Sequence, residues 1–384
     1  MGKLFTSSQI SELRVQNRTI RSATWEGLAD AEGFIRPKLV QMLAEVAKGN
    51  VGLVIPGYFY IKPDGKGLPW QAGICYDAHV EGLKQLVDAV HKEGAAIAAQ
   101  IAHAGGRTRP KTIGGSRPAA PSAIDGFSFG ETPRELTLPE IHLLIEAFAQ
   151  AARRVKEAGF DAVQLHAAHG YLLSQFLSPL LNLRKDGYGG TRKKRQRFVI
   201  EVYEAVRSEV GRDFPVFIKL NTTDGPQNGI TPEESLEIVK QLESLGLDAV
   251  EVSGGIAGSD LYRPSRKSIT RPSEEAYFRF AAKLFKEHLR IPVILVGGIK
   301  SYEVADNILR EKYADFVSFS RPLICEPDLI LRWYRGDISK SRCLSCNLCL
   351  QEGLKGSGIA CAAKKKAKNP IAQDIDWPQP KSAD

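Results

Sequence analysis

Eight short apolar runs, spaced along most of this 384-residue chain, constrain its fold more than any other feature. Each run is rich in β-branched residues, is bounded by turn residues and lacks the alternation of a half-exposed sheet, which favours buried parallel strands. The predicted strands cover residues 17–23, 51–56, 95–101, 161–165, 215–220, 248–253, 292–296 and 315–320.

Segments of helical periodicity separate most of these runs, at residues 80–91, 140–158, 196–210, 232–245 and 273–289. One helix-to-strand turn also recurs, as Glu-Ala-Gly-Phe-Asp-Ala-Val-Gln and as Ser-Leu-Gly-Leu-Asp-Ala-Val-Glu. Strands that alternate with helices form parallel sheets, and eight of them close naturally into a barrel. The sequence therefore predicts an α/β fold, a (β/α)8 TIM barrel over residues 1–335, with a doubly wound open sheet as the alternative.

Composition limits the classes of protein to which the chain can belong. Hydrophobic residues make up 43% and charged residues 25%, which is typical of a globular protein and excludes a disordered or fibrous one. The net charge of +8 favours anionic ligands such as phosphates, but no basic run is interleaved with aromatic residues, so no nucleic-acid partner is expected. The chain lacks an apolar leader and a run of about 18 apolar residues, which predicts a cytoplasmic protein with no membrane partner.

Two regions lie outside the strand and helix pattern. Residues 103–139, after the third predicted strand, form a long connection rich in Gly, Pro and Ser, which we expect to be part lid and part wall of a pocket. Residues 336–384 are predicted to form a Cys-rich segment and, from Ala362, a flexible basic tail that includes Lys-Lys-Lys-Ala-Lys.

The active sites of such barrels lie at the carboxyl ends of the strands, so the residues that end each run are the candidates for chemistry. His166 and His169 come just after the fourth run, and Tyr171 lies two residues further on. Two imidazoles can donate hydrogen bonds to a carbonyl oxygen, and a phenol can donate a proton. A zinc fragment or a pair of buried, hydrogen-bonded histidines is the alternative, although no third histidine or acid lies near enough in sequence to complete a zinc site.

The stretch from His166 to Thr191, which begins His-Ala-Ala-His-Gly-Tyr and ends Asp-Gly-Tyr-Gly-Gly-Thr, resembles the signature of the Old Yellow Enzyme family of FMN-dependent oxidoreductases. Residues 17–20, 100–107 and 296–299 are similar to further segments of that family, so the resemblance spans about residues 4–335. It implies an FMN across the barrel mouth, NADH or NADPH as its reductant, and an α,β-unsaturated carbonyl compound as the small-molecule substrate.

The resemblance also implies a role for individual residues. His166 and His169 would hold the carbonyl oxygen of the substrate, and Tyr171 would protonate its α-carbon as an ene-reductase requires. Gln100 would bind the pyrimidine edge of the flavin, and Lys219 would lie beside its N1 and C2 carbonyl. The full set of implied flavin and phosphate contacts is Ser22, Ala23, Thr24, Trp25, Gly57, Gln100, Lys219, Gly297, Gly298, Ser320 and Arg321.

Three of these positions depart from the family pattern. Trp25 lies where relatives often have Cys or Thr, Lys219 replaces a usual Arg, and Ser320 replaces a usual Gly. A lysine keeps the positive charge but lacks the bidentate fork of arginine, so the redox potential of the flavin is the property most open to change.

Four cysteines lie close together near the end of the chain, as Cys343-x2-Cys346-x2-Cys349-x11-Cys361. Such thiols can hold an iron–sulfur cluster or a structural zinc ion, or they can be reduced surface thiols. The segment is similar to the 4Fe-4S site of the dienoyl-CoA-reductase-like branch of the family, which has one more residue between the second and third cysteines. Because that branch continues into a further flavin- and nucleotide-binding portion, a cluster here would need an external electron donor. Cys75 and Cys325 are expected to be isolated structural residues.

Several alternatives stay open. The basic run Arg192–Arg197 is either the solvated start of a helix or an anion site that would favour NADPH over NADH. Instead of an ene-reductase, the chain could be an amine dehydrogenase or demethylase of the same family, a flavin-free lyase that forms a Schiff base on Lys219, or a non-catalytic binding protein. The sequence does not decide whether the protein is a homo-oligomer.

Overall fold

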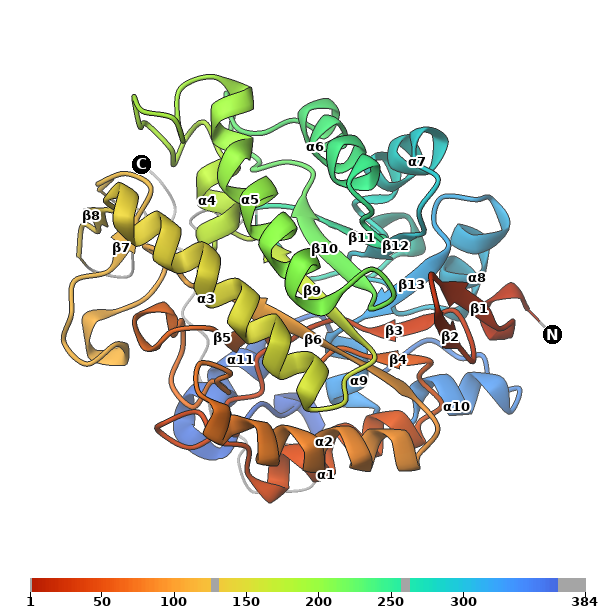
Figure 1. Ribbon diagram of the computed structural model, residues 1–384. Helices are drawn as coiled ribbons and strands as arrows, with labels where there is room; N and C mark the ends of the chain where they lie inside the picture. Colours follow the sequence, from red (N-terminus) through yellow and green to blue (C-terminus); the bar gives the residue numbers. More distant parts are fainter. Residues whose placement is uncertain (1, 126–130, 257–262, 365–384) are drawn as a thin grey trace, which may run out of the picture.

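Eight parallel strands close into a barrel in the computed structural model, which describes residues 2–125, 131–256 and 263–364 (Figure 1). Their hydrogen-bonded order is β4-β3-β13-β12-β11-β10-β9-β6, and a further pairing of β4 with β6 closes the ring. The TIM-barrel prediction is thus confirmed, and each predicted run overlaps one strand: β3 (Thr19–Arg21), β4 (Leu53–Val54), β6 (Ala96–Ala102), β9 (Ala162–Ala167), β10 (Val216–Asn221), β11 (Ala249–Ser253), β12 (Val293–Val296) and β13 (Phe316–Phe319).

Helices surround this ring. Four match predicted segments closely: α2 (Val80–Lys92), α3 (Leu138–Glu157), α5 (Arg192–Val210) and α6 (Pro232–Ser244). The fifth, α7 (Arg279–His288), begins six residues later than residue 273, because Ala276 has a φ of +52° that a helix does not allow. Among the described residues, six further α-helices have no counterpart among the predicted segments: α1 (Pro37–Lys48), α4 (Leu172–Leu177), α8 (Tyr302–Arg310), α9 (Arg321–Cys325), α10 (Leu329–Tyr334) and α11 (Leu348–Glu352).

The interior of the barrel is filled at its amino-terminal end. A hairpin of β1 (Ser8–Ile10) and β2 (Leu13–Val15) contributes Ile10 and Val15 to an apolar cluster with inward-facing side chains such as Phe217. A second, larger apolar cluster lies between the strands and the helices. Because apolar side chains close one end, polar chemistry is left to the carboxyl ends of the strands.

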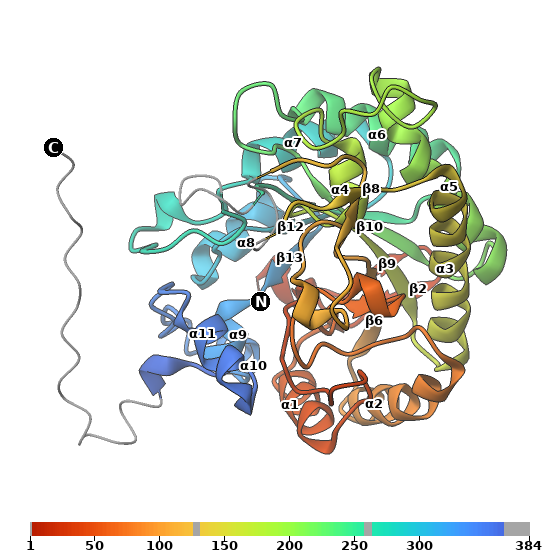
Figure 2. The same ribbon diagram turned by 90° about the vertical axis from the view of Figure 1, so that its left-hand side faces the viewer.

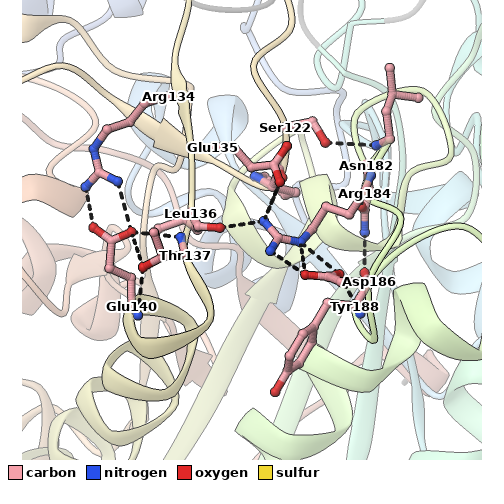
Figure 3. A network of polar contacts seen from close by, with 12 residues as sticks. Ser122, Arg134, Glu135, Leu136, Thr137, Glu140, Asn182, Arg184, Asp186 and Tyr188 are labelled. Atoms are coloured by element: carbon pink, nitrogen blue, oxygen red, sulfur yellow. Dashed lines mark hydrogen bonds and ion pairs between the residues drawn. The ribbon is translucent and has the colours of Figure 1, made fainter.

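The long connection after β6 is anchored by polar contacts (Figure 3). Its short strands β7 (Ala119–Ala120) and β8 (Arg134–Glu135) pair in parallel. The buried Arg184 guanidinium donates to the carbonyls of Pro121 and Leu136, at 3.0 and 2.6 Å, and pairs with Asp186. These contacts fix residues 119–121 and 134–136 against the segment that carries Arg184, and Arg107 is the one described residue of this connection that lines the cavity at the barrel mouth. Residues 126–130, part of the expected lid, lie outside the described residues.

Residues 336–364 pack beside the barrel mouth. The amide of Ile359 donates to the carbonyl of Glu26 at 2.7 Å, and a Cβ placed on Gly353 would come within 2.6 Å of the Trp25 ring. Figure 2 shows α9, α10 and α11 gathered on the side of the molecule opposite α3. The predicted flexible tail lies outside the described residues from position 365 onward. No helix in the described ranges is long and apolar enough to cross a membrane.

Candidate active site

A cavity of about 310 Å³ opens at the carboxyl ends of the strands. Ten of the predicted site residues line it: Ser22, Ala23, Thr24, Trp25, His169, Tyr171, Lys219, Gly298, Ser320 and Arg321. The other four of that set, His166, Gly57, Gln100 and Gly297, are buried but do not belong to the described lining. The barrel thus brings together side chains from strand ends that are up to about 300 residues apart in sequence.

A tight turn after β9 sets the direction of Tyr171. His169 and Gly170 both adopt left-handed conformations, with φ of +64° and +75°. A Cβ on Gly170 would lie 3.1 Å from the Ile256 side chain and 3.3 Å from that of Arg107, so glycine suits this position in both conformation and space. The turn leaves the Tyr171 hydroxyl donating to the hydroxyl of Tyr58 at 2.7 Å, with ring centroids 5.0 Å apart.

The two histidines are neighbours but occupy different environments. Their rings lie 5.2 Å apart and nearly perpendicular. His169 faces the cavity, and its Nε2 lies 2.7 Å from the Ser253 hydroxyl. His166 lies behind Tyr171, with ring centroids 4.8 Å apart, and its Nδ1 has no partner among the described residues.

Both imidazoles are held in the neutral form. Burial, followed by the positive charges of Lys219 and Arg107, keeps the pKa of His166 well below its usual value. Burial, followed by repulsion from His166, does the same to the pKa of His169. Neutral imidazoles can still donate N–H hydrogen bonds to a developing negative charge, while the full positive charges of the cavity come from lysine and arginine.

A buried polar network lies beneath the cavity, and the strand register builds it. Gln100 pairs with Gln164 across β6 and β9, and Lys219 pairs with Glu251 across β10 and β11. The Lys219 ammonium donates to Glu251 Oε1 at 3.1 Å and to the Ser22 hydroxyl at 2.7 Å. An amine engaged in this way is poorly suited to attack a carbonyl, which counts against the Schiff-base lyase.

The charge of the cavity suits a ligand that carries phosphate. Among the described residues that line it, Arg107, Lys219, Lys300 and Arg321 are positive and none is acidic. Gly298 has a φ of +72°, and a Cβ there would lie 2.3 Å from the Ile269 side chain, so only glycine leaves the cradle open. The buried Ser318 hydroxyl lines the cavity without a partner among the described residues, as expected of a group that meets a ligand. These residues fit FMN.

The four cysteines near the end of the chain, unlike the residues around the cavity, are not arranged to hold their predicted cofactor. In the part of the chain that the structure describes, no group of three or more His, Cys, Asp or Glu side chains is arranged to hold a metal ion. As placed, Cys343, Cys346, Cys349 and Cys361 do not fit a cluster, and the metal site stays a prediction. Cys325 is not isolated as expected: its thiol is hydrogen-bonded to that of Cys361, and burial, followed by this bond, raises the pKa of Cys325.

The basic run after Thr191 starts helix α5. Thr191 caps the helix by accepting a hydrogen bond from the amide of Lys194. Arg195 is buried and pairs with Glu234 at 2.5 Å, and Arg197 pairs with Glu201 at 2.7 Å. This pairing favours the helix-start interpretation over the anion site.

The sequence profile of the NADH:flavin oxidoreductase / NADH oxidase family matches residues 3–337. The chain belongs to this family. An NADH oxidase from Thermoanaerobacter brockii is 37% identical over 349 residues, which are 90% of this chain and 53% of that protein. The chain therefore spans about half the length of this relative.

Solved structures agree with this membership. A 2-naphthoyl-CoA reductase in complex with 2-naphthoyl-CoA superimposes with a TM-score of 0.88 at 29% identity, over 97% of this chain and 58% of that one. An Old Yellow Enzyme homologue from Zymomonas mobilis gives a TM-score of 0.75 at 27% identity, over 88% and 94% of the two chains. The resemblance to Old Yellow Enzyme is confirmed, and the family supports an oxidoreductase that uses FMN and NAD(P)H over a lyase or a non-catalytic binding protein.

Two polar contributors were missed in the sequence. Glu251 is the one charged residue inside the apolar run Ala249–Ser253, and that break in the pattern was a usable signal. Lys300 donates to the carbonyls of Ile269 and Cys343 at 2.6 and 3.0 Å, and nothing in its local sequence marks it. Its position becomes meaningful only when the chain after β13 returns to the cavity.

Proposed function

We propose that this protein is an FMN-dependent ene-reductase that reduces the C=C bond of an α,β-unsaturated carbonyl compound with NADH or NADPH. The observation that carries the proposal is the position of the Tyr171 phenol. Its ring centroid lies 4.8 Å from that of the His166 imidazole, and Tyr171 lines the same cavity as His169. A proton donor beside two neutral N–H donors suits protonation of an alkene whose carbonyl is being polarised.

Bound FMN would supply hydride chemistry, taking a hydride from NAD(P)H and passing it to the β-carbon of the alkene. Lys219, Arg321 and Gly298 would hold the cofactor, because they supply the positive charge and the open backbone of the cavity. His166 and His169 would stabilise the negative charge that develops on the carbonyl oxygen. Tyr171 would give its proton to the α-carbon and recover one from water, so that the product gains two hydrogens.

Tyr58 has a supporting part in this scheme. In the resting protein its hydroxyl accepts the Tyr171 hydrogen bond. Burial, followed by the proximity of Tyr171, holds the pKa of Tyr58 well above its usual value, so Tyr58 keeps its proton. The Tyr58 hydroxyl can therefore turn and donate to the Tyr171 oxygen as that oxygen becomes negative.

Replacing Tyr58 by Phe should slow alkene reduction about 10- to 100-fold, because a hydrogen bond to a charged oxygen contributes about 1.5–3 kcal/mol. Flavin reduction by NAD(P)H should change little, and rapid-mixing measurement of the two half-reactions separates these effects. Tyr60→Phe is the matched control, because the Tyr60 hydroxyl donates to the carbonyl of Glu32 and its ring is outside the described lining. Equal slowing by both variants would show that Tyr58 only fills space.

The proposed function itself is tested on protein purified without oxygen. We expect flavin absorption bands that bleach on addition of NADH or NADPH and return when a cyclic enone is added, with the saturated ketone as product. Flavin bands that no enone restores, but that an amine bleaches in the absence of NADH and NADPH, would replace the ene-reductase by an amine dehydrogenase of the family. Protein without flavin would refute both.

A further inference from the structure

We propose that Glu251 tunes the reduction potential of the bound flavin by partly neutralising the charge of Lys219. Glu251 has no exposed surface and does not line the cavity, whereas the Lys219 amine does. Glu251 would therefore act through Lys219 as a positioning residue, without touching cofactor or substrate.

Three donors surround the Glu251 carboxylate. Its Oε1 accepts from the Ser22 hydroxyl at 2.7 Å and from the Lys219 ammonium at 3.1 Å, and its Oε2 accepts from the Gln164 amide at 3.1 Å. An ionised carboxylate is an acceptor only, so three donors directed at its two oxygens suit the charged form. The carboxylate is thus fixed in place as a buried negative charge.

The Gln164 side chain is itself held in one orientation. Its carbonyl oxygen accepts a 2.6 Å hydrogen bond from the Gln100 amide, so its own amide group must face Glu251. The Gln100–Gln164 hydrogen bond therefore keeps the Gln164 amide directed at the Glu251 carboxylate. Gln100 and Gln164 lie opposite each other because β6 and β9 pair in this register. Among the described residues of this network (Ser22, Gln100, Gln164, Lys219 and Glu251), Lys219 is the one cation. The net charge of the Lys219–Glu251 pair is therefore close to zero.

The consequence follows from the charge of the cofactor. A flavin gains electrons on reduction, and its reduced form is favoured by positive charge nearby. A lone buried lysine at the cavity wall would favour the reduced form strongly. A carboxylate 3.1 Å from the same amine opposes that effect, which lowers the potential. The inference needs only that FMN binds in this cavity, and it does not depend on the identity of the oxidising substrate.

Glu251→Gln keeps the size of the side chain and removes its charge. We expect the affinity for reduced FMN to rise at least tenfold relative to that for oxidised FMN, which is a rise of about 30 mV for a two-electron couple. The potential is measured on the holoenzyme by equilibration with a reference dye. Lys219→Gln should move the potential in the opposite direction.

The double variant Lys219→Gln/Glu251→Gln separates tuning from folding. It carries no buried charge at this position, so its potential should lie close to that of the parent protein. We expect the difference from the parent to be less than half the shift measured for Glu251→Gln. Glu234→Gln is the matched control, because Glu234 is a buried carboxylate paired with Arg195 at 2.5 Å, outside the described lining of the cavity. This control should leave the potential unchanged.

Two results would overturn the inference. One is a potential in Glu251→Gln that stays level or falls while the protein still binds FMN. The other is a double variant displaced as far as Glu251→Gln itself. If Glu251→Gln does not fold, the sign of the Lys219→Gln shift and the position of the double variant still decide the matter. If the parent protein does not reduce alkenes but the variants show the expected potential shifts, the ene-reductase proposal is refuted and the role of Glu251 is still supported.

Discussion

Replacing Tyr171 by Phe is expected to slow alkene reduction about 100- to 10,000-fold, the usual contribution of a positioned general acid. The variant keeps the ring and its packing but loses the hydroxyl that lies 2.7 Å from that of Tyr58. Reduction of the flavin by NAD(P)H should stay within about twofold, because that step takes no proton from Tyr171. Rapid-mixing kinetics of each half-reaction measures both rates.

The same experiment has a decisive unfavourable outcome. If both half-reactions slow equally, Tyr171 shapes the cavity and the proton comes from elsewhere. The double variant Tyr58→Phe/Tyr171→Phe adds a second criterion: if Tyr58 acts only through Tyr171, the double variant should be no slower than Tyr171→Phe alone. A further large loss would mean that Tyr58 donates a proton on its own.

Removing both imidazoles should give the second large effect. The variant His166→Ala/His169→Ala is expected to lose about 100-fold or more in kcat/KM for an enone, because loss of one oxyanion donor commonly costs 100- to 1,000-fold. Binding of a phenolate to the oxidised flavin, followed by its long-wavelength absorption, should weaken about 10- to 100-fold.

His79→Ala is the control for this variant, since His79 is also buried but contacts the carbonyl of Glu32 instead of the cavity. Phenolate affinity that is unchanged in the double histidine variant would contradict the oxyanion role. Because burial holds the pKa of both site histidines well below the usual value, their protonation should not alter phenolate affinity between about pH 6 and 8. Added affinity on acidification across that range would show that an imidazolium takes part.

The start of α7 was predicted wrongly because the backbone conformation of one residue does not follow the helical periodicity of the sequence. The predicted segment began at residue 273, yet Ala276 is left-handed and buried three residues before α7 begins at Arg279. A left-handed φ at this residue prevents the helix from starting earlier, whatever the helix propensity of alanine. α1 was not predicted, although Pro37 in its first turn is a start signal that the sequence carries.

The sequence by itself determined the barrel and which side chains lie at the ends of its strands. Buried parallel strands need continuous apolar runs, and the turn after β9 needs glycine, so both leave local signals in the chain. The tertiary structure alone decided which groups meet: the Tyr58 hydroxyl with that of Tyr171, and the Glu251 carboxylate with the Lys219 ammonium. Tyr58 and Tyr171 are 113 positions apart and Lys219 and Glu251 are 32 apart, and closure of the barrel with its strand register sets both contacts. Local sequence can mark Glu251 as unusual within its strand but does not reveal its partner, because the energy of such pairs depends on burial and distance in the folded protein.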